Sequence, residues 1–224
     1  MNTFLLIVVL TAAAAAQLLA RQSPSEPSAN GYFIPNKGQW PAGALYFSPT
    51  PGMNLWVTAG GVVFDKFRTE RSGAGVRRVG HIVRLESTVA TAAVSAAGEQ
   101  PSEARFNYFY GKNSSAWISN VPAFHSVTLR EFSPGVDLAL QFEDGAPRYD
   151  FIVSPNADLR RLAFRFAGAE SVRLRDDGAW LLLKTSLGDI STGRIIAYQE
   201  IDGKHRPVAC RFVPAMPDGG TTAL

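Results

Sequence analysis

The chain has one cysteine in 224 residues, Cys210, and this scarcity excludes an intramolecular disulfide. Cys210 lies in the segment "PVACRF", where Val208, Cys210 and Phe212 alternate with other residues and so share one face of an expected strand. We therefore expect Cys210 to be buried and to pack as a small hydrophobic residue. The alternative is a reactive thiol.

Residues that build metal and nucleophilic sites are also sparse. The three histidines, His81, His125 and His205, are isolated, and no H-E-x-x-H, H-x-H or Cys/His cluster occurs. There is no G-x-S-x-G, no P-loop and no dinucleotide-binding fingerprint. We expect no metal, no cofactor and no catalytic residues. A hydrolase assembled from distant strands is the less favoured alternative, and Asp137, Asp150 and His125 are the residues that we would inspect for it.

Charge of one sign is not concentrated anywhere in the chain. Lysine and arginine number 22 and aspartate and glutamate 19, a net charge of +3. The basic pairs Arg77-Arg78 and Arg160-Arg161 are short and are not part of a longer basic stripe. We therefore expect no nucleic-acid partner.

The N-terminus has a long apolar run, from Phe4 to Ala16, followed by polar sequence. Small residues from Ala14 to Ala16 fit a cleavage site before Gln17, and a second site ends at Ala20. We predict a helical signal peptide over residues 1–16 and a protein that is secreted, at the cell surface or in the periplasm. The membrane would then be a partner only during export, whereas the alternative is a membrane anchor.

The remaining chain has almost no helical periodicity and repeated period-two alternation, as in "YDFIV" and "LAFRF". Asp-Gly pairs in "FEDGAP", "RDDGAW" and "EIDGKH" are typical of tight hairpins. We predict an all-β, antiparallel β-sandwich-like domain over residues 32–213. We expect residues 17–31 to be a Ser/Pro-rich disordered spacer and residues 214–224 to be a flexible tail. The weak pattern over 87–104 offers a boundary between two packed β lobes.

The stretch "PGVDLALQFEDG" places three carboxylates, Asp137, Glu143 and Asp144, around an apolar alternation. If Leu138 and Leu140 point inward, Asp137 and Glu143 point outward and are separated by roughly 20 Å at a strand rise of ~3.3 Å per residue. Glycosidase carboxylates lie ~5–9.5 Å apart, and a calcium loop needs D-x-D-x-D-G spacing that is missing here. We interpret these acids as the solvent face and turn of a hairpin.

An aromatic group is the one constellation with binding potential: Trp40, Tyr108, Phe109, Tyr110 and Trp117. Flat rings on a β surface can stack on sugars or on a partner chain. We select Trp40, Tyr108, Tyr110 and Trp117 as contact residues for a protein or cell-surface partner, with a glycan as the alternative ligand. Ordinary core and loop packing would explain the same residues without any ligand.

Several motifs occur in a fixed order along nearly all of residues 32–213: "FIPNKGQW", "NYFYGKNSSAWISNVPAF", "PGVDL", "YDFIVSPNAD" and "AYQEIDGKHRPV". In this order they resemble the N-terminal domain of unknown function in bacterial exported proteins with SBBP (β-propeller) repeats. The resemblance implies a secreted or cell-surface β-rich module with no established activity. The repeats themselves do not occur within the 224 residues, so the expectation concerns the N-terminal module alone. A carbohydrate-binding module remains the alternative function.

Overall fold

The computed structural model describes residues 5–13, 31–72, 75–89, 95–202, 204–215 and 220–223. Regular structure in these residues is predominantly antiparallel β-strand, as the alternation predicts. Short 3₁₀ turns interrupt the strands: η1 (Ser114–Ala116), η2 (Leu159–Arg161) and η3 (Asp176–Gly178). Within these ranges no helix is both long enough and apolar enough to span a bilayer.

The first sheet has the order β12-β13-β14-β1-β10-β9-β8-β7, and β15 pairs with both β1 and β16. Its strands are β1 (Leu5–Ala13), β7 (Ser95–Tyr108), β8 (Ile118–Ser133), β9 (Val136–Glu143), β10 (Ala146–Val153), β12 (Ser171–Arg175), β13 (Trp180–Lys184), β14 (Ile190–Thr192), β15 (Ile196–Ile201) and β16 (Lys204–Val208).

The second sheet has the order β17-β18-β11-β6-β5-β4-β3-β2. Its strands are β2 (Ile34–Pro35), β3 (Ala44–Ser48), β4 (Met53–Thr58), β5 (Gly61–Ser72), β6 (Gly75–Ser87), β11 (Ala163–Ala167), β17 (Phe212–Ala215) and β18 (Gly220–Ala223). A bridge between Phe33 and Phe124 joins the start of this sheet to β8 of the first.

The core lies between the two sheets, where each contributes one apolar face. Phe64 of β5 meets Tyr149 of β10 with ring centroids 6.4 Å apart. Phe151 of β10 stacks on Phe164 of β11 at 5.2 Å. These rings are essentially inaccessible to solvent. The predicted sandwich-like arrangement of antiparallel sheets is thus confirmed.

The β9–β10 hairpin confirms the interpretation of the "PGVDLALQFEDG" stretch. Leu138 and Leu140 are buried, while Asp137 accepts from Arg130 Nη1 at 2.7 Å and from the Glu131 backbone N–H at 2.8 Å. Glu131 has a φ of 54° at an irregularity in β8. Asp137 therefore stabilises a bulged stretch of the neighbouring strand.

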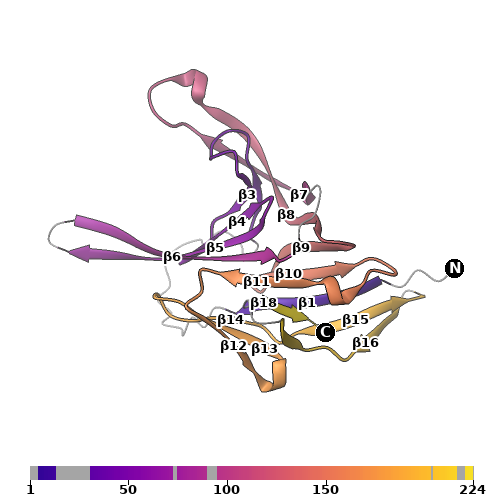
Figure 1. Cartoon of the computed structure of the whole chain (residues 1–224). Coiled ribbons are helices and arrows are strands. Elements are labelled where there is room, and N and C mark those ends of the chain that lie inside the picture. The colour runs from indigo at the N-terminus through magenta and orange to yellow at the C-terminus, as the bar shows by residue number, and fades with distance from the viewer. Residues whose placement is uncertain are drawn as a thin grey trace.

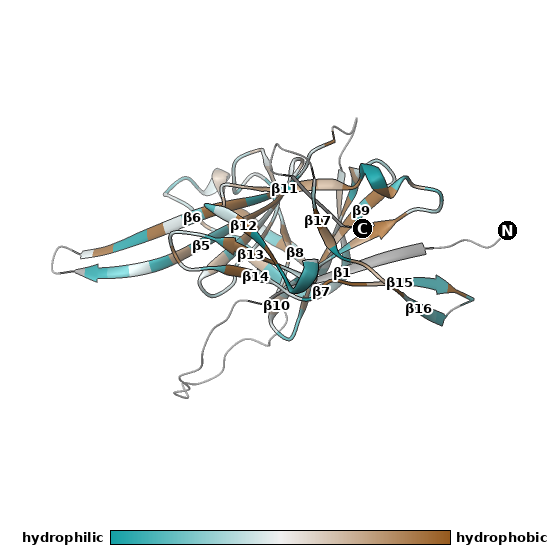
Figure 2. Cartoon of the chain, turned by 60° about the horizontal axis from the view of Figure 1, so that its bottom comes forward, coloured by the Kyte–Doolittle hydropathy of each residue, from teal (hydrophilic) through white to brown (hydrophobic). Residues whose placement is uncertain are grey.

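Two long hairpins extend away from the packed sheets (Figure 1). One is β5–β6, whose outer half pairs from Phe67↔Gly80 to Ser72↔Gly75. The other is β7–β8, which ends in η1. Figure 2 shows hydrophobic strands gathered near the centre of the molecule, whereas the outer parts of β5–β6 and β15–β16 carry hydrophilic residues.

The predicted N-terminal helix is wrong for the residues that can be compared. Leu5–Ala13 forms strand β1, between β10 on one side and β15 and β14 on the other. The isoleucine, valines and threonine of this run have high β-propensity, and pairing on two sides favours the extended form. Residues 1–4 and 14–30, which hold the predicted cleavage sites and most of the spacer, lie outside the described residues.

The expectation of a single "PVACRF" strand was also wrong. β16 ends at Val208, which is 36% exposed, and β17 begins only at Phe212. All five residues of β16 are exposed, so no part of the described structure covers either face of this edge strand, and it pairs only with β15. Cys210, in the connection, is half-buried and packs against the core, and burial raises the pKa of its thiol.

The segment over 87–104 is largely strand where it is described. β7 begins at Ser95 and pairs with β8 from Ser95↔Arg130 onward. The aromatic segment after it contains the short 3₁₀ turn η1, and strands flank that turn on both sides. Of the expected tail over 214–224, Gly220–Ala223 forms β18.

Candidate functional site

The aromatic residues selected from the sequence lie around the outer end of the β7–β8 hairpin. β7 ends at Tyr108, β8 begins at Ile118, and the connection is exposed. Asn113 caps η1 by accepting from the Ser115 backbone N–H at 3.1 Å. Gly111, with a φ of 70°, allows the chain to leave the strand. The loop is thus shaped by its own polar contacts, and its rings are free to face outward.

Trp40 is the inner member of the aromatic group. Its ring contacts Tyr108 at 5.3 Å, Trp56 at 5.7 Å and Phe47 at 5.0 Å, which brings β3, β4 and β7 together. Asn36 holds the segment around it, because its Nδ2 donates to the Trp40 carbonyl at 3.1 Å. Trp40 is therefore a packing residue that supports the base of this hairpin end.

Tyr108 and Tyr110 continue the group outward, with ring centroids 5.9 Å apart and an interplanar angle of 37°. Tyr108 is half-buried, and burial, with a further contribution from Tyr110, raises the pKa of its hydroxyl. Tyr110 is 58% exposed, so the group passes from packed to open within three residues.

Phe109 and Trp117 form a separate pair beside the same loop. Their ring centroids are 5.1 Å apart in an edge-to-face arrangement, and Trp117 Nε1 donates to the Gly111 carbonyl at 3.3 Å. Phe109 is 59% and Trp117 43% exposed. We call Phe109, Tyr110 and Trp117 the tip rings. Exposed aromatic side chains gathered at one end of a hairpin are typical of a contact surface.

The structure thus brings the four selected residues to one end of the molecule but divides them. Trp40, Tyr108 and Tyr110 form a chain of contacts, whereas Trp117 pairs with Phe109. Phe109 belonged to the aromatic group but was left out of the selection. Strand alternation in "NYFYG" could have indicated that Phe109 faces away from Tyr108 and Tyr110.

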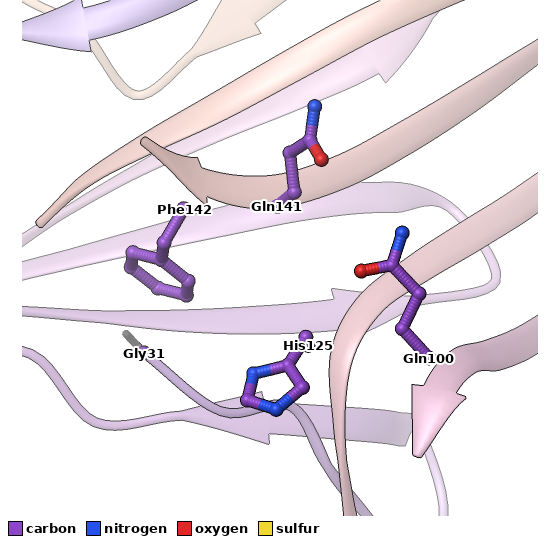
Figure 3. A pocket seen from close by; sticks show the side chains of 5 residues that line it. All are labelled: Gly31, Gln100, His125, Gln141 and Phe142. Atoms are coloured by element: carbon purple, nitrogen blue, oxygen red, sulfur yellow. The ribbon is translucent and has the colours of Figure 1, made fainter. Parts of the chain in front are cut away.

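A small pocket of about 300 Å³ lies elsewhere, between β7, β8 and the end of β9. The amides of Gln100 and Gln141 and the rings of His125 and Phe142 surround it, with Gly31 beside them (Figure 3). A Cβ on Gly31 would lie 2.4 Å from the Phe142 ring, so the chain approaches this ring closely. The lining has no ionised carboxylate or amine.

The three residues named for a hydrolase are held by different partners. His125 packs against the Tyr32 ring at 5.4 Å, and Asp137 pairs with Arg130. Asp150 pairs with Arg148 at 2.9 Å and accepts from Gln141 Nε2 at 3.4 Å. Within the part of the chain that the structure describes, no hydrogen bond joins any two of these three residues.

A serine–histidine contact that sequence reasoning missed joins the two sheets. His81 of β6 lies 2.8 Å from Ser186 Oγ through Nδ1 and 2.8 Å from the Gly168 carbonyl through Nε2. The Ser186 backbone N–H also donates to Nδ1 at 3.2 Å, so the ring proton lies on Nε2. Since 105 residues separate the two, only the tertiary structure could bring them together.

The loop between β13 and β14, which contains Ser186, has a second attachment to the other sheet. Lys66 Nζ donates to the carbonyls of Gly188 at 2.9 Å and Asp189 at 3.0 Å. The histidine, the serine and the lysine therefore tie the β13–β14 loop to β5 and β6, which is a structural role. In the described ranges, no group of three or more histidine, cysteine or acidic side chains could hold a metal ion.

Comparison with known proteins gives one family. The sequence model of a family described as "Domain of unknown function (DUF7948)" matches residues 33–220. No curated protein and no solved structure matches the chain.

Proposed function

The chain belongs to the DUF7948 family of domains of unknown function, and we propose that it is an exported, non-catalytic β-rich module. Its role is to make protein contacts at the cell surface. The observation that supports this function best is the group of tip rings, because three large rings stay exposed at the end of a hairpin that extends from the core.

The chemistry of the tip rings suits a protein partner. Aromatic residues are enriched in the buried centres of protein interfaces, where they supply most of the binding free energy. The hairpin is supported near its base by Tyr46, whose hydroxyl accepts from the Gly98 N–H at 2.8 Å, and near its outer end by Trp40, which packs on Tyr108. A rigid base reduces the conformational entropy that the hairpin loses on binding.

Export is the second component of the proposal. It is supported by the apolar run from Phe4 to Ala16 with its small-residue cleavage sites. The motifs that resemble N-terminal domains of SBBP-repeat proteins support the same setting. We propose that the module is of that N-terminal type and acts beside further surface domains.

A carbohydrate-binding module is the second candidate, favoured by Tyr108 and Tyr110 on one side of the hairpin. Sugars stack on the faces of aromatic rings, so a binding platform needs several open faces. Trp40 meets Tyr108 at an interplanar angle of 74°, and its other neighbours are Phe47 and Trp56. This packing leaves Tyr110 as the main open ring on that side and supports a protein partner over a glycan.

The proposal is tested by binding of the labelled protein to intact cells of the producing organism. We expect saturable binding that weakens at least tenfold when Phe109→Ser and Trp117→Ser are combined. The matched control combines Leu174→Ser and Trp180→Ser, which remove a similarly exposed aliphatic and aromatic pair on β12 and β13. The control should bind like the unmodified protein.

Treatment of the cells separates the two candidate partners. Protease digestion of the cell surface should abolish binding, and soluble cell-surface polysaccharide should not compete. Competition by polysaccharide would instead favour the carbohydrate-binding function. The same affinity for both double variants would contradict a role for the tip rings.

A further inference from the structure

Strand β1 occupies an interior position of the first sheet. Its residues Leu6–Thr11 pair with β10, and Leu5–Val9 pair with β15 on the opposite side. Figure 1 shows β1 running between these neighbours. Among the pairings of the described residues, those that join β7–β10 to β12–β16 all pass through β1. We call the space between β10 and β15 the strand slot.

The walls of the strand slot are apolar where they face the core. Tyr149, Phe151 and Val153 of β10 are each at most 4% exposed and take register positions opposite Leu10, Val8 and Leu6. On β15, Ala197 is 3% exposed and is also opposite Val8. The segment that fills the slot, Leu5–Ala13, has no charged residue. The slot therefore suits an uncharged strand.

The same nine residues form the centre of the predicted signal peptide, so this step rests on the export component of the proposed function. Removal of the signal peptide takes the strand away. β10 and β15 are both antiparallel to β1 and hence parallel to each other. With β1 gone they would be about 10 Å apart, two strand spacings, and each would have an unpaired row of backbone N–H and C=O groups.

We propose that the strand slot of the processed protein binds an extended, uncharged, apolar segment donated by a partner protein. The segment adds as an antiparallel strand, so that backbone hydrogen bonds give affinity and the apolar walls select side chains. A second copy of this chain is a poorer donor, because its described strands are already paired within its own sheets. In the unprocessed chain, Leu5–Ala13 occupies the strand slot. Its uncharged, apolar sequence is the kind of segment that we expect a partner to donate.

The first experiment tests the register of β1 in the full chain. Ile7 and Ile152 are directly paired, and paired strand residues lie within the Cα separation that a disulfide can span. In a chain with Ile7→Cys, Ile152→Cys and Cys210→Ser, we expect a disulfide after mild oxidation, detected by mass spectrometry. A control chain with Ile7→Cys and Ser154→Cys should form much less. Equal yields, or none in either chain, would overturn the proposal.

The second experiment tests binding in trans. A specific protease site is placed within residues 21–28 of the full chain, and the folded protein is cut. A fluorescent peptide with the sequence of Leu5–Ala13, flanked by lysines for solubility, is then exchanged into the cut protein in large excess. We expect saturable binding by anisotropy. A Val9→Pro peptide, which keeps the charge and the other apolar residues but loses a backbone donor, should bind at least tenfold more weakly.

Equal binding of both peptides would mean unspecific hydrophobic adsorption, and binding of neither would mean that β15 closes on β10. Either result overturns the strand slot. Neither result depends on whether the protein is exported or whether the tip rings bind cells. Conversely, retention of the intact chain in the cytoplasm would contradict the proposed function and leave both slot measurements unchanged.

Discussion

Asp150 is a carboxyl group that the fold has largely removed from water. Its residue is 7% exposed, its Oδ1 accepts from Arg148 Nε, and its Oδ2 accepts from Gln141. Burial raises the pKa of Asp150 more than the Arg148 contacts lower it. Because the pKa is higher in the folded than in the unfolded state, the stability that this group contributes is complete below its unfolded pKa and is lost as pH rises through the folded pKa.

The raised pKa of Asp150 leads to a prediction about how stability depends on pH. Asp150→Asn has a side chain of nearly the same shape that does not ionise, so comparison with it cancels the titration of the other groups. We expect the unfolding free energy of the unmodified protein, relative to Asp150→Asn, to fall as pH rises from about 4, near the unfolded pKa, toward 7. Urea unfolding at several pH values measures it, and an opposite slope would contradict the raised pKa.

Leu140 provides the corresponding test of the core. It is 2% exposed on the inward face of β9, so Leu140→Ala leaves a cavity and should cost about 2–5 kcal/mol of unfolding free energy. Glu143→Ala, on the other face of the same strand, removes only an exposed ion pair with Arg148 and should cost at most about 1 kcal/mol. Urea unfolding of both variants is the measurement, and similar losses would mean that the facing of β9 is wrong.

At the level of hairpins, the turns follow directly from residue chemistry. Asp144, Asp177 and Asp202 have φ values of 50°, 53° and 52°, and each lies between two paired strands. Aspartate and glycine tolerate this left-handed region better than other residues. The hairpins predicted at "EDG", "DDG" and "IDG" are therefore confirmed.

Two glycines separate the effect of backbone angle from the effect of crowding. Gly61 and Gly75 have φ values of 133° and 127°, but a Cβ on Gly61 would lie 2.1 Å from the Leu85 carbonyl oxygen, whereas Gly75 has open space. Both alanine substitutions should cost about 1–3 kcal/mol from φ strain, and Gly61→Ala should cost clearly more. Thermal unfolding of the two variants measures the difference, and equal losses would exclude the crowding.

The whole molecule consists of two sheets that depend on contacts between distant segments. β1 links two groups of strands in the first sheet, and the loop before β14 is fastened to β5 and β6 of the second. The β7–β8 and β5–β6 hairpins extend beyond this body. The molecule therefore has a rigid centre and separate surfaces that are available for contacts.

Export is a property of the whole chain, and it makes a direct prediction. Expressed in a bacterial host with its own N-terminus, the protein should be recovered from the periplasm or medium with Gln17 or Arg21 as its first residue. N-terminal sequencing is the measurement. A chain in which Leu10→Arg interrupts the apolar run is the control and should stay in the cytoplasm. Recovery of the intact Met1 form from the cytoplasm in both cases would contradict export.

Local pattern was sufficient to predict the strand content, most hairpin turns and the inward face of β9. Alternation with a period of two residues indicates which residues share a face of a strand. Asp-Gly pairs indicate where the chain reverses direction. The aromatic residues around the β7–β8 loop could also be selected, because they are concentrated in one short segment.

Pairing between distant segments was decided only by the tertiary structure. Nothing local indicates that β1 lies between β10 and β15, that Trp40 packs on Tyr108 while Trp117 pairs with Phe109, or that His81 meets Ser186. The predicted burial of Val208 and Cys210 on one strand face was wrong for the same reason, because an alternating segment is buried only if another sheet covers it. The sequence thus determined the faces of the strands, and long-range packing determined which faces meet.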